Sequence, residues 1–282
     1  MVSEFIGALL FNPFLFAAFL AASAVSVAGG IVGSYVVVKR IVFISGSISH
    51  CVLGGMGFFL WLQRVHGIEW AYPTLGALVA ALIAALLVGW IHLFYRERED
   101  TVIAAVWAIG MSLGIVFISQ TPGYNVELTN FLLGNILWVS PTDLYTLLLL
   151  DLCALVIVAF FHTRFLAICF DEEQARLQGL PVTALYMLLL VLTALTTVLL
   201  IQVVGIVLVI TMLAIPPAIA NLCTRSLSHM IVLAVCLSFL FSVGGLFAAF
   251  SLDWPVGASI ALTAGMGYLL VAGFKKLSMR FS

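Results

Sequence analysis

Long apolar runs separated by short polar breaks organise the whole chain. A helix needs about 20 apolar residues to cross a hydrocarbon core about 30 Å thick. The run at 126–139 is too short to cross and is predicted to be a re-entrant or interfacial segment. The stretch 183–221 is nearly unbroken, and we interpret it as two helices, with eight spans as the alternative to nine. About nine runs have the required length: residues 14–38, 41–62, 71–95, 102–119, 144–163, 183–200, 203–221, 229–250 and 256–274.

The composition agrees with this pattern, because 64% of the 282 residues are hydrophobic and only 8% are charged. The mean hydropathy is +1.27. No soluble domain could bury so much apolar surface, so we predict an all-α polytopic membrane protein. The sequence contains no long linker or low-complexity tail, and residues 1–282 are therefore treated as a single transmembrane domain.

The basic residues predict the orientation of the spans. With the N-terminus outside and nine spans threaded in order, the C-terminus is cytoplasmic and only Arg64 among the Lys and Arg residues lies outside. This bias is what the positive-inside rule requires. The cytoplasmic side then receives Lys39, Arg40, Arg96, Arg98, Arg164, Arg176, Arg225, Lys275, Lys276 and Arg280.

His50 lies where an ionisable residue is costly. It is about nine residues into the span that starts near Ile41, on the order of 13 Å deep at 1.5 Å per residue. Ionisable groups at that depth usually face a polar interior or a transport pathway. Three serines surround it at positions 45, 47 and 49. His50 is therefore a candidate metal ligand; the alternative is a buried histidine bonded to a helix carbonyl.

A short polar segment from Phe170 to Pro181 has the signals of a capped helix. Asp171 is a good N-cap, Glu172 and Glu173 place negative charge at the positive end of the helix dipole, and Gly179 is a natural C-terminal stop. A two-turn helix between two spans has the shape of a coupling helix that docks onto a motor subunit. A plain amphipathic connector is the alternative.

Three features lie in or near the apolar spans. Pro216 and Pro217 remove two helical N–H donors, so we expect a kink or break there, near Gly205, as either a packing kink or a gating element. The spacings Gly29-x-x-x-Gly33 and Gly110-x-x-x-Gly114 favour close helix contacts. Asp151 and Asp253 are expected to be local cap or turn residues, with Asp253 as a weaker metal candidate.

The chain carries no nucleotide-binding P-loop, because none of its lysines follows a glycine. It is therefore not expected to be an enzyme. If transport is driven by ATP, the hydrolysis takes place on another polypeptide.

Taken together, these motifs resemble the permease subunit of bacterial ABC importers for zinc, manganese and iron ions. The tract from Gly33 through Lys39-Arg40 to Ser49-His50 is similar to the family's Gly-Ser-x-x-Val-x-Arg-Arg stretch followed by Gly-Asp-Ala-Leu-Ser-His. Four further tracts match in order: residues 133–137, 171–180, 202–218 and 251–258. The resemblance covers most of the chain.

The resemblance implies a set of partners and roles. Two permease chains, identical or paralogous, would pair in the bacterial cytoplasmic membrane with cytoplasmic ATP-binding subunits, and an extracytoplasmic metal-binding protein would deliver the ion. Membrane lipid is expected around the chain and no nucleic acid. A divalent metal would be cargo, with no permanently bound cofactor and ATP on the partner subunit. His50 would contact the ion, and the coupling residues would be Asp171, Glu172, Glu173, Ala175 and Gly179.

One departure from the family pattern affects the metal. The motif aspartate aligns with Gly46, four residues before His50 and on the same helix face. Manganese favours oxygen ligands whereas zinc accepts imidazole readily, so the missing carboxylate favours zinc or a weaker, more transient site. The alternative function is a stand-alone proton-coupled secondary metal transporter with His50 as the proton relay.

Overall fold

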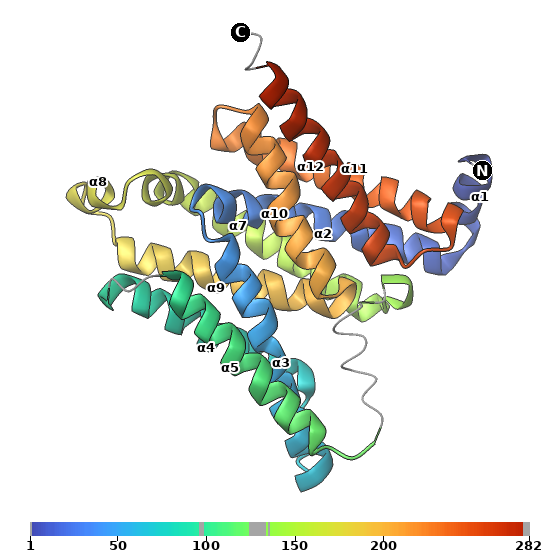
Figure 1. Cartoon of the computed structure of the whole chain (residues 1–282), viewed down its shortest axis with the longest axis horizontal. Helices are drawn as coiled ribbons and strands as arrows, with labels where there is room; N and C mark the ends of the chain where they lie inside the picture. Colours follow the sequence, from blue (N-terminus) through green and yellow to red (C-terminus); the bar gives the residue numbers. More distant parts are fainter. Residues whose placement is uncertain (1, 96–98, 124–133, 135, 279–282) are drawn as a thin grey trace.

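The computed structural model describes residues 2–95, 99–123, 134 and 136–278, and every regular element in that part of the chain is helical (Figure 1). The short elements are α1 (Val2–Phe11), the 3-10 helix η1 (Ile136–Trp138) and α8 (Glu172–Leu177). The long helices are α2 (Pro13–Val38), α3 (Val42–His66), α4 (Pro73–Tyr95), α5 (Glu99–Ser119), α7 (Pro141–Phe170), α9 (Val182–Val204), α10 (Ile206–Cys223), α11 (Leu227–Leu252) and α12 (Val256–Ser278).

Nine helices in the described residues are long and apolar enough to cross a membrane, which confirms the all-α polytopic fold. The stretch 183–221 is two helices, because Gly205 separates α9 from α10. Its φ of 81° is one that side-chain-bearing residues rarely adopt, and glycine reaches it without steric cost. The inward and outward assignment of the termini stays a prediction. Most of the segment predicted to be re-entrant, at 126–139, lies outside the described residues.

The helix ends follow local capping rules. Asn12 caps α2 by accepting from the backbone N–H of Phe14 at 3.0 Å, and Pro13 occupies the first helical position. A capping box between Ser140 and Asp143 starts α7. Helix α1 was not among the predicted elements. Its Phe5 packs edge-on against Phe247 of α11, which attaches this ten-residue helix to the bundle.

Helix α2 lies deep in the bundle and packs on α7, α10 and α11. Membrane helices associate without a hydrophobic driving force, so small residues that let backbones approach are favoured. A methyl group on Gly30 would lie 2.6 Å from the Val235 side chain of α11, and one on Gly29 would lie 3.4 Å from Met212 of α10. The Gly29/Gly33 pair therefore packs within the chain.

The prolines of α10 do not break it, which corrects part of the sequence prediction. The helix is continuous from Ile206 to Cys223, and both Pro216 and Pro217 are buried. Removing the N–H of Pro217 leaves the carbonyl of Leu213 without its usual helical donor. That oxygen faces Gly33 of α2 so closely that an added methyl group would lie 2.5 Å from it. The contact with α2 supports α10 at the site where a donor is missing.

Candidate functional site

His50 lies in the first half of α3, with its side chain half-buried. The imidazole stacks on the indole of Trp107 from α5, with ring centroids 4.1 Å apart and planes 9° from parallel. Trp107 is held in turn by its Nε1–H, which donates to Sδ of Met111 at 2.9 Å. No hydrogen bond reaches the His50 ring from any described residue. The interpretation as a histidine bonded to a helix carbonyl is therefore not supported, and both ring nitrogens are available.

The space beside His50 is open at Gly46. This glycine is buried, yet a methyl group added to it would meet nothing within 4 Å. The neighbouring hydroxyls do not fill the gap. Ser45 and Ser49 donate to carbonyls of their own helix, those of Val42 at 2.7 Å and Ser45 at 2.8 Å. The position that would carry the family carboxylate is thus unoccupied space one turn from the imidazole.

The described side chains around His50 make an incomplete metal site. Within the described residues, no group of three or more His, Cys, Asp or Glu side chains is placed to hold a metal ion. A single imidazole is a weak ligand set for any divalent cation, which usually takes four or more donors. Further ligands would have to come from outside this described set of side chains.

The two candidate aspartates differ from one another. Asp253 is the C-cap of α11 with a φ of 52°, so it is the predicted turn residue, and it lines a 510 Å³ cavity together with Asn12 and Trp254. Asp151 is not a cap, because Ser140 and Asp143 cap α7. It lies within that helix with its side chain buried, and its Oδ1 has no hydrogen-bond partner in the described structure. An acid buried at such depth marks a functional position more often than a structural one.

Helix α8 has the predicted caps. Asp171 accepts from the backbone N–H of Gln174 at 3.0 Å. At the other end Gly179, with a φ of 77°, donates to the carbonyl of Arg176 at 2.9 Å, and Leu180 donates to that of Ala175 at 3.1 Å. This pair of bonds is a Schellman ending. Ala175 is buried under the helix, whereas Glu173 and Leu177 are exposed, so α8 presents a mixed polar and apolar surface at one edge of the bundle (Figure 1).

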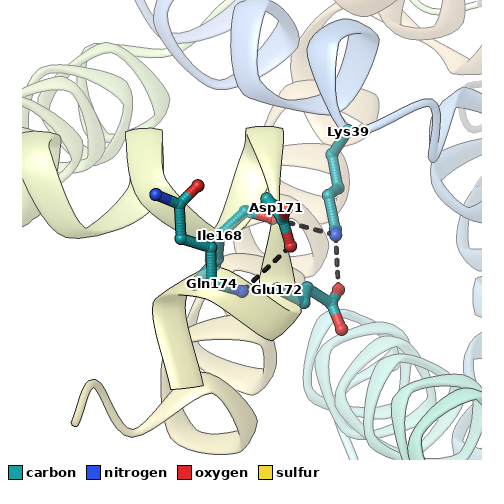
Figure 2. A network of polar contacts seen from close by, with 5 residues as sticks. All are labelled: Lys39, Ile168, Asp171, Glu172 and Gln174. Atoms are coloured by element: carbon teal, nitrogen blue, oxygen red, sulfur yellow. Dashed lines mark hydrogen bonds and ion pairs between the residues drawn. The ribbon is translucent and has the colours of Figure 1, made fainter. Parts of the chain in front are cut away.

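The tertiary structure adds an ion pair to this helix that the sequence did not indicate. Figure 2 shows Lys39, at the end of α2, paired with Glu172 at the start of α8 and bonded to the carbonyl oxygen of Ile168. The residues of the pair are 133 positions apart. Opposite charges at two helix ends were the available signal, but many other pairings of the basic residues were equally compatible with the sequence.

A second polar contact ties α2 to α7 about one turn away. The hydroxyl of the fully buried Tyr35 is 2.7 Å from Nδ1 of His162, and Nε2 of that ring is 3.1 Å from the hydroxyl of Ser228 on α11. Three helices therefore share one hydrogen-bonded chain close to the Lys39 contacts.

Comparison with known proteins places the chain. A model of the ABC 3 transport family matches residues 12–275. The chain belongs to this family. The chain is 51% identical over 258 residues to a probable metal transport system membrane protein of Chlamydia pneumoniae. This alignment covers 92% of this chain and 88% of that protein.

Two further relatives of this ABC 3 family member extend the comparison. It is 33% identical over 270 residues to the manganese transport system membrane protein MntC of Halalkalibacterium halodurans, covering 96% of this chain and 90% of that one. Its fold matches a chain of PsaBC from Streptococcus pneumoniae in complex with Fab, with a TM-score of 0.83 and 32% identity over 96% of this chain and 95% of that chain. The chain is therefore a multi-pass inner-membrane permease of the ABC type.

Proposed function

We propose that this chain is the membrane-spanning permease of an ATP-driven importer for a divalent transition metal ion. Zinc and manganese are the expected cargoes, and iron is a further candidate. The observation that carries the proposal is His50, an imidazole in an apolar helix of membrane-spanning length with open space beside it at Gly46 and no hydrogen bond from the described residues. A neutral imidazole is a ligand that all three metals accept.

The proposal requires partners, and features of the chain support them. The capped helix α8, with its exposed Leu177 and its 250 Å³ hollow against the end of α7, provides a surface for a cytoplasmic ATP-binding subunit. A second permease chain, identical or paralogous, is proposed as one source of the ligands that the described side chains around His50 do not supply. An extracytoplasmic metal-binding protein would present the ion at the opposite side.

The choice of ion depends on two opposed observations. Relatives that are named for manganese transport favour manganese. The absence of a carboxylate at Gly46 favours zinc, because manganese binds oxygen ligands better than nitrogen. Uptake measured with both ions in the same preparation decides between them.

The first experiment reconstitutes the permease with its co-expressed ATP-binding subunit in vesicles and measures uptake of zinc and manganese. We expect uptake only when ATP and the partner subunit are both present. Uptake that needs neither would establish the alternative, a proton-coupled secondary transporter that works alone.

The second experiment tests His50 directly. His50→Ala removes the imidazole without disturbing a hydrogen bond among the described residues. It should lower uptake at least tenfold, which is about the loss that even outer-shell partners of metal ligands produce. His66→Ala, an exposed histidine at the far end of the same helix, is the matched control and should leave uptake unchanged. Unchanged uptake in His50→Ala, with the ATP-binding subunit still bound, would remove His50 from the ion path.

A further inference from the structure

Lys39 joins four helices at the α8 edge of the bundle. Its ammonium donates to the carbonyl oxygen of Ile168 at 3.0 Å and pairs with the carboxylate of Glu172 (Figure 2). The same ammonium lies 5.5 Å from the ring centroid of Tyr186. Ile168 belongs to α7, Glu172 to α8 and Tyr186 to α9, so one side chain at the end of α2 contacts all three.

The environment of Lys39 makes these contacts stronger than an ordinary surface ion pair. Its side chain is 13% exposed and that of Glu172 is 24% exposed, so solvent screens the pair less than it would two fully exposed charges. Ile168 is in the last turn of α7, where backbone carbonyls lack helical donors. A cation at that end also complements the helix dipole.

Apart from its chain connections to α7 and α9, few side chains of α8 hold it to the membrane helices. The helix has six residues, and Ala175 is its one buried side chain. The remaining side chains face outward, apart from Glu172, which is turned toward Lys39. The ion pair is therefore a principal link between α8 and α2.

The end of α2 is in turn tightly joined to α3. Arg40, with a φ of 62°, ends α2 in a Schellman arrangement: its N–H donates to Val37 at 3.1 Å and that of Ile41 donates to Val36 at 2.9 Å. Helix α3 begins at Val42. A displacement of the backbone at Lys39 is therefore expected to move the start of α3, the helix that carries His50 about 12 Å further along at 1.5 Å per residue.

We infer that Lys39 is a positioning residue that transmits movement of α8 to α3. Through its ion pair with Glu172 it links the surface that meets the ATP-binding subunit to the helix that meets the ion. This inference rests on the proposed function, because it presumes that ATP hydrolysis by a partner drives metal uptake. It adds the residue pair through which the two events are coupled.

The test measures ATP hydrolysis and metal uptake in the same vesicles and compares ions imported per ATP. Lys39→Met keeps the length of the side chain and removes its charge. We expect it to lower this ratio roughly tenfold while hydrolysis continues, within the range that mutations of coupling elements give. Lys39→Arg keeps the charge and should retain most of the coupling. Glu172→Gln should lower the number of ions imported per ATP as much as Lys39→Met does. The double variant should have the same ratio as either single variant, because both substitutions remove the same interaction.

Lys275→Met is the matched control. Lys275 is also a lysine at a helix end that donates to a carbonyl of another helix, that of Leu222 at 2.6 Å, but it contacts no carboxylate in the described structure. It should keep the wild-type ratio. A wild-type ratio in Lys39→Met, or additive losses in the double variant, would overturn the inference. A wild-type complex that imports no metal with ATP would instead overturn the proposed function.

Discussion

The glycines at two sites along α3, one in each half, differ in how closely other helices approach them. In the second half, a methyl group on Gly54 would lie 2.6 Å from the carbonyl oxygen of Gly110 in α5. A methyl group on Gly55 would overlap the carbonyl oxygen of Gly76 in α4. In the first half, a methyl group on Gly46 would meet nothing within 4 Å. The same residue type therefore serves close packing in one half and leaves space in the other.

The difference separates a close-packed site from the site at which we propose that the ion binds. The second half is clamped between α4 and α5 by backbone contacts that only glycine permits. The first half contains His50 and adjoins the α2–α3 junction that Lys39 holds. Most of the first half is buried as well, so the open space is confined to Gly46, one turn from His50.

The largest effect is expected from Gly55→Ala. The added methyl group would overlap the Gly76 carbonyl and lie 2.5 Å from the side chain of Ala80, so α3 and α4 must separate. Overpacking of this kind costs about 1–3 kcal/mol, and backbone atoms cannot move aside as a side chain can. We expect a clearly lower melting temperature in detergent and a lower yield of folded protein. Unchanged thermal stability would show that the second half is not clamped as described.

A smaller effect, on selectivity, is expected from Gly46→Asp. The new carboxylate enters open space four residues from His50 and could share a metal with it. Because manganese favours carboxylate oxygen, manganese uptake should rise relative to zinc uptake by about tenfold. Gly46→Asn has nearly the same size without the charge and serves as the control. An equal manganese-to-zinc ratio in all three proteins would separate Gly46 from the ion path.

A still smaller effect, on the apparent affinity for the ion, is expected from Trp107→Ala. Stacked aromatic pairs contribute about 0.5–1.5 kcal/mol, so losing the indole should weaken the apparent affinity for the ion about two- to tenfold. Trp107 is 37% exposed, and its truncation should leave the fold intact. Trp107→Phe keeps a ring under the imidazole, so its apparent affinity for the ion should lie between those of the wild type and Trp107→Ala. If Trp107→Phe and Trp107→Ala transport alike, the stack does not orient His50.

The smallest effect is expected for Gly46→Ala. The methyl group meets no atom, and alanine stabilises a helix interior by about 0.5–1 kcal/mol relative to glycine. The melting temperature should therefore stay the same or rise slightly, opposite in sign to Gly55→Ala in the same helix. A large loss of stability would contradict the open space at this position.

Local features of the fold were predictable because they depend on neighbouring residues. The lengths of the apolar runs predicted the spans, and the order Asp171, Glu172, Gly179 predicted both ends of α8. Of the predicted kink or break at Pro216 and Pro217, the break is excluded because α10 is continuous, whereas the kink and the gating role stay predictions. The local rule counts the donors that proline removes, but it does not include Gly33 on another helix, which lies against one of the freed carbonyls.

By itself, the sequence determined that this is a polytopic helical membrane protein with a capped helix between two spans and a histidine at membrane depth, since chain length, hydropathy and capping act over a few residues. Only the tertiary structure decided what these features touch. It placed Trp107 against His50, left Gly46 open, and joined Lys39 to Glu172 across 133 positions. These contacts depend on how whole helices pack, and several packings satisfy the same apolar pattern because lipid does not distinguish one apolar face from another.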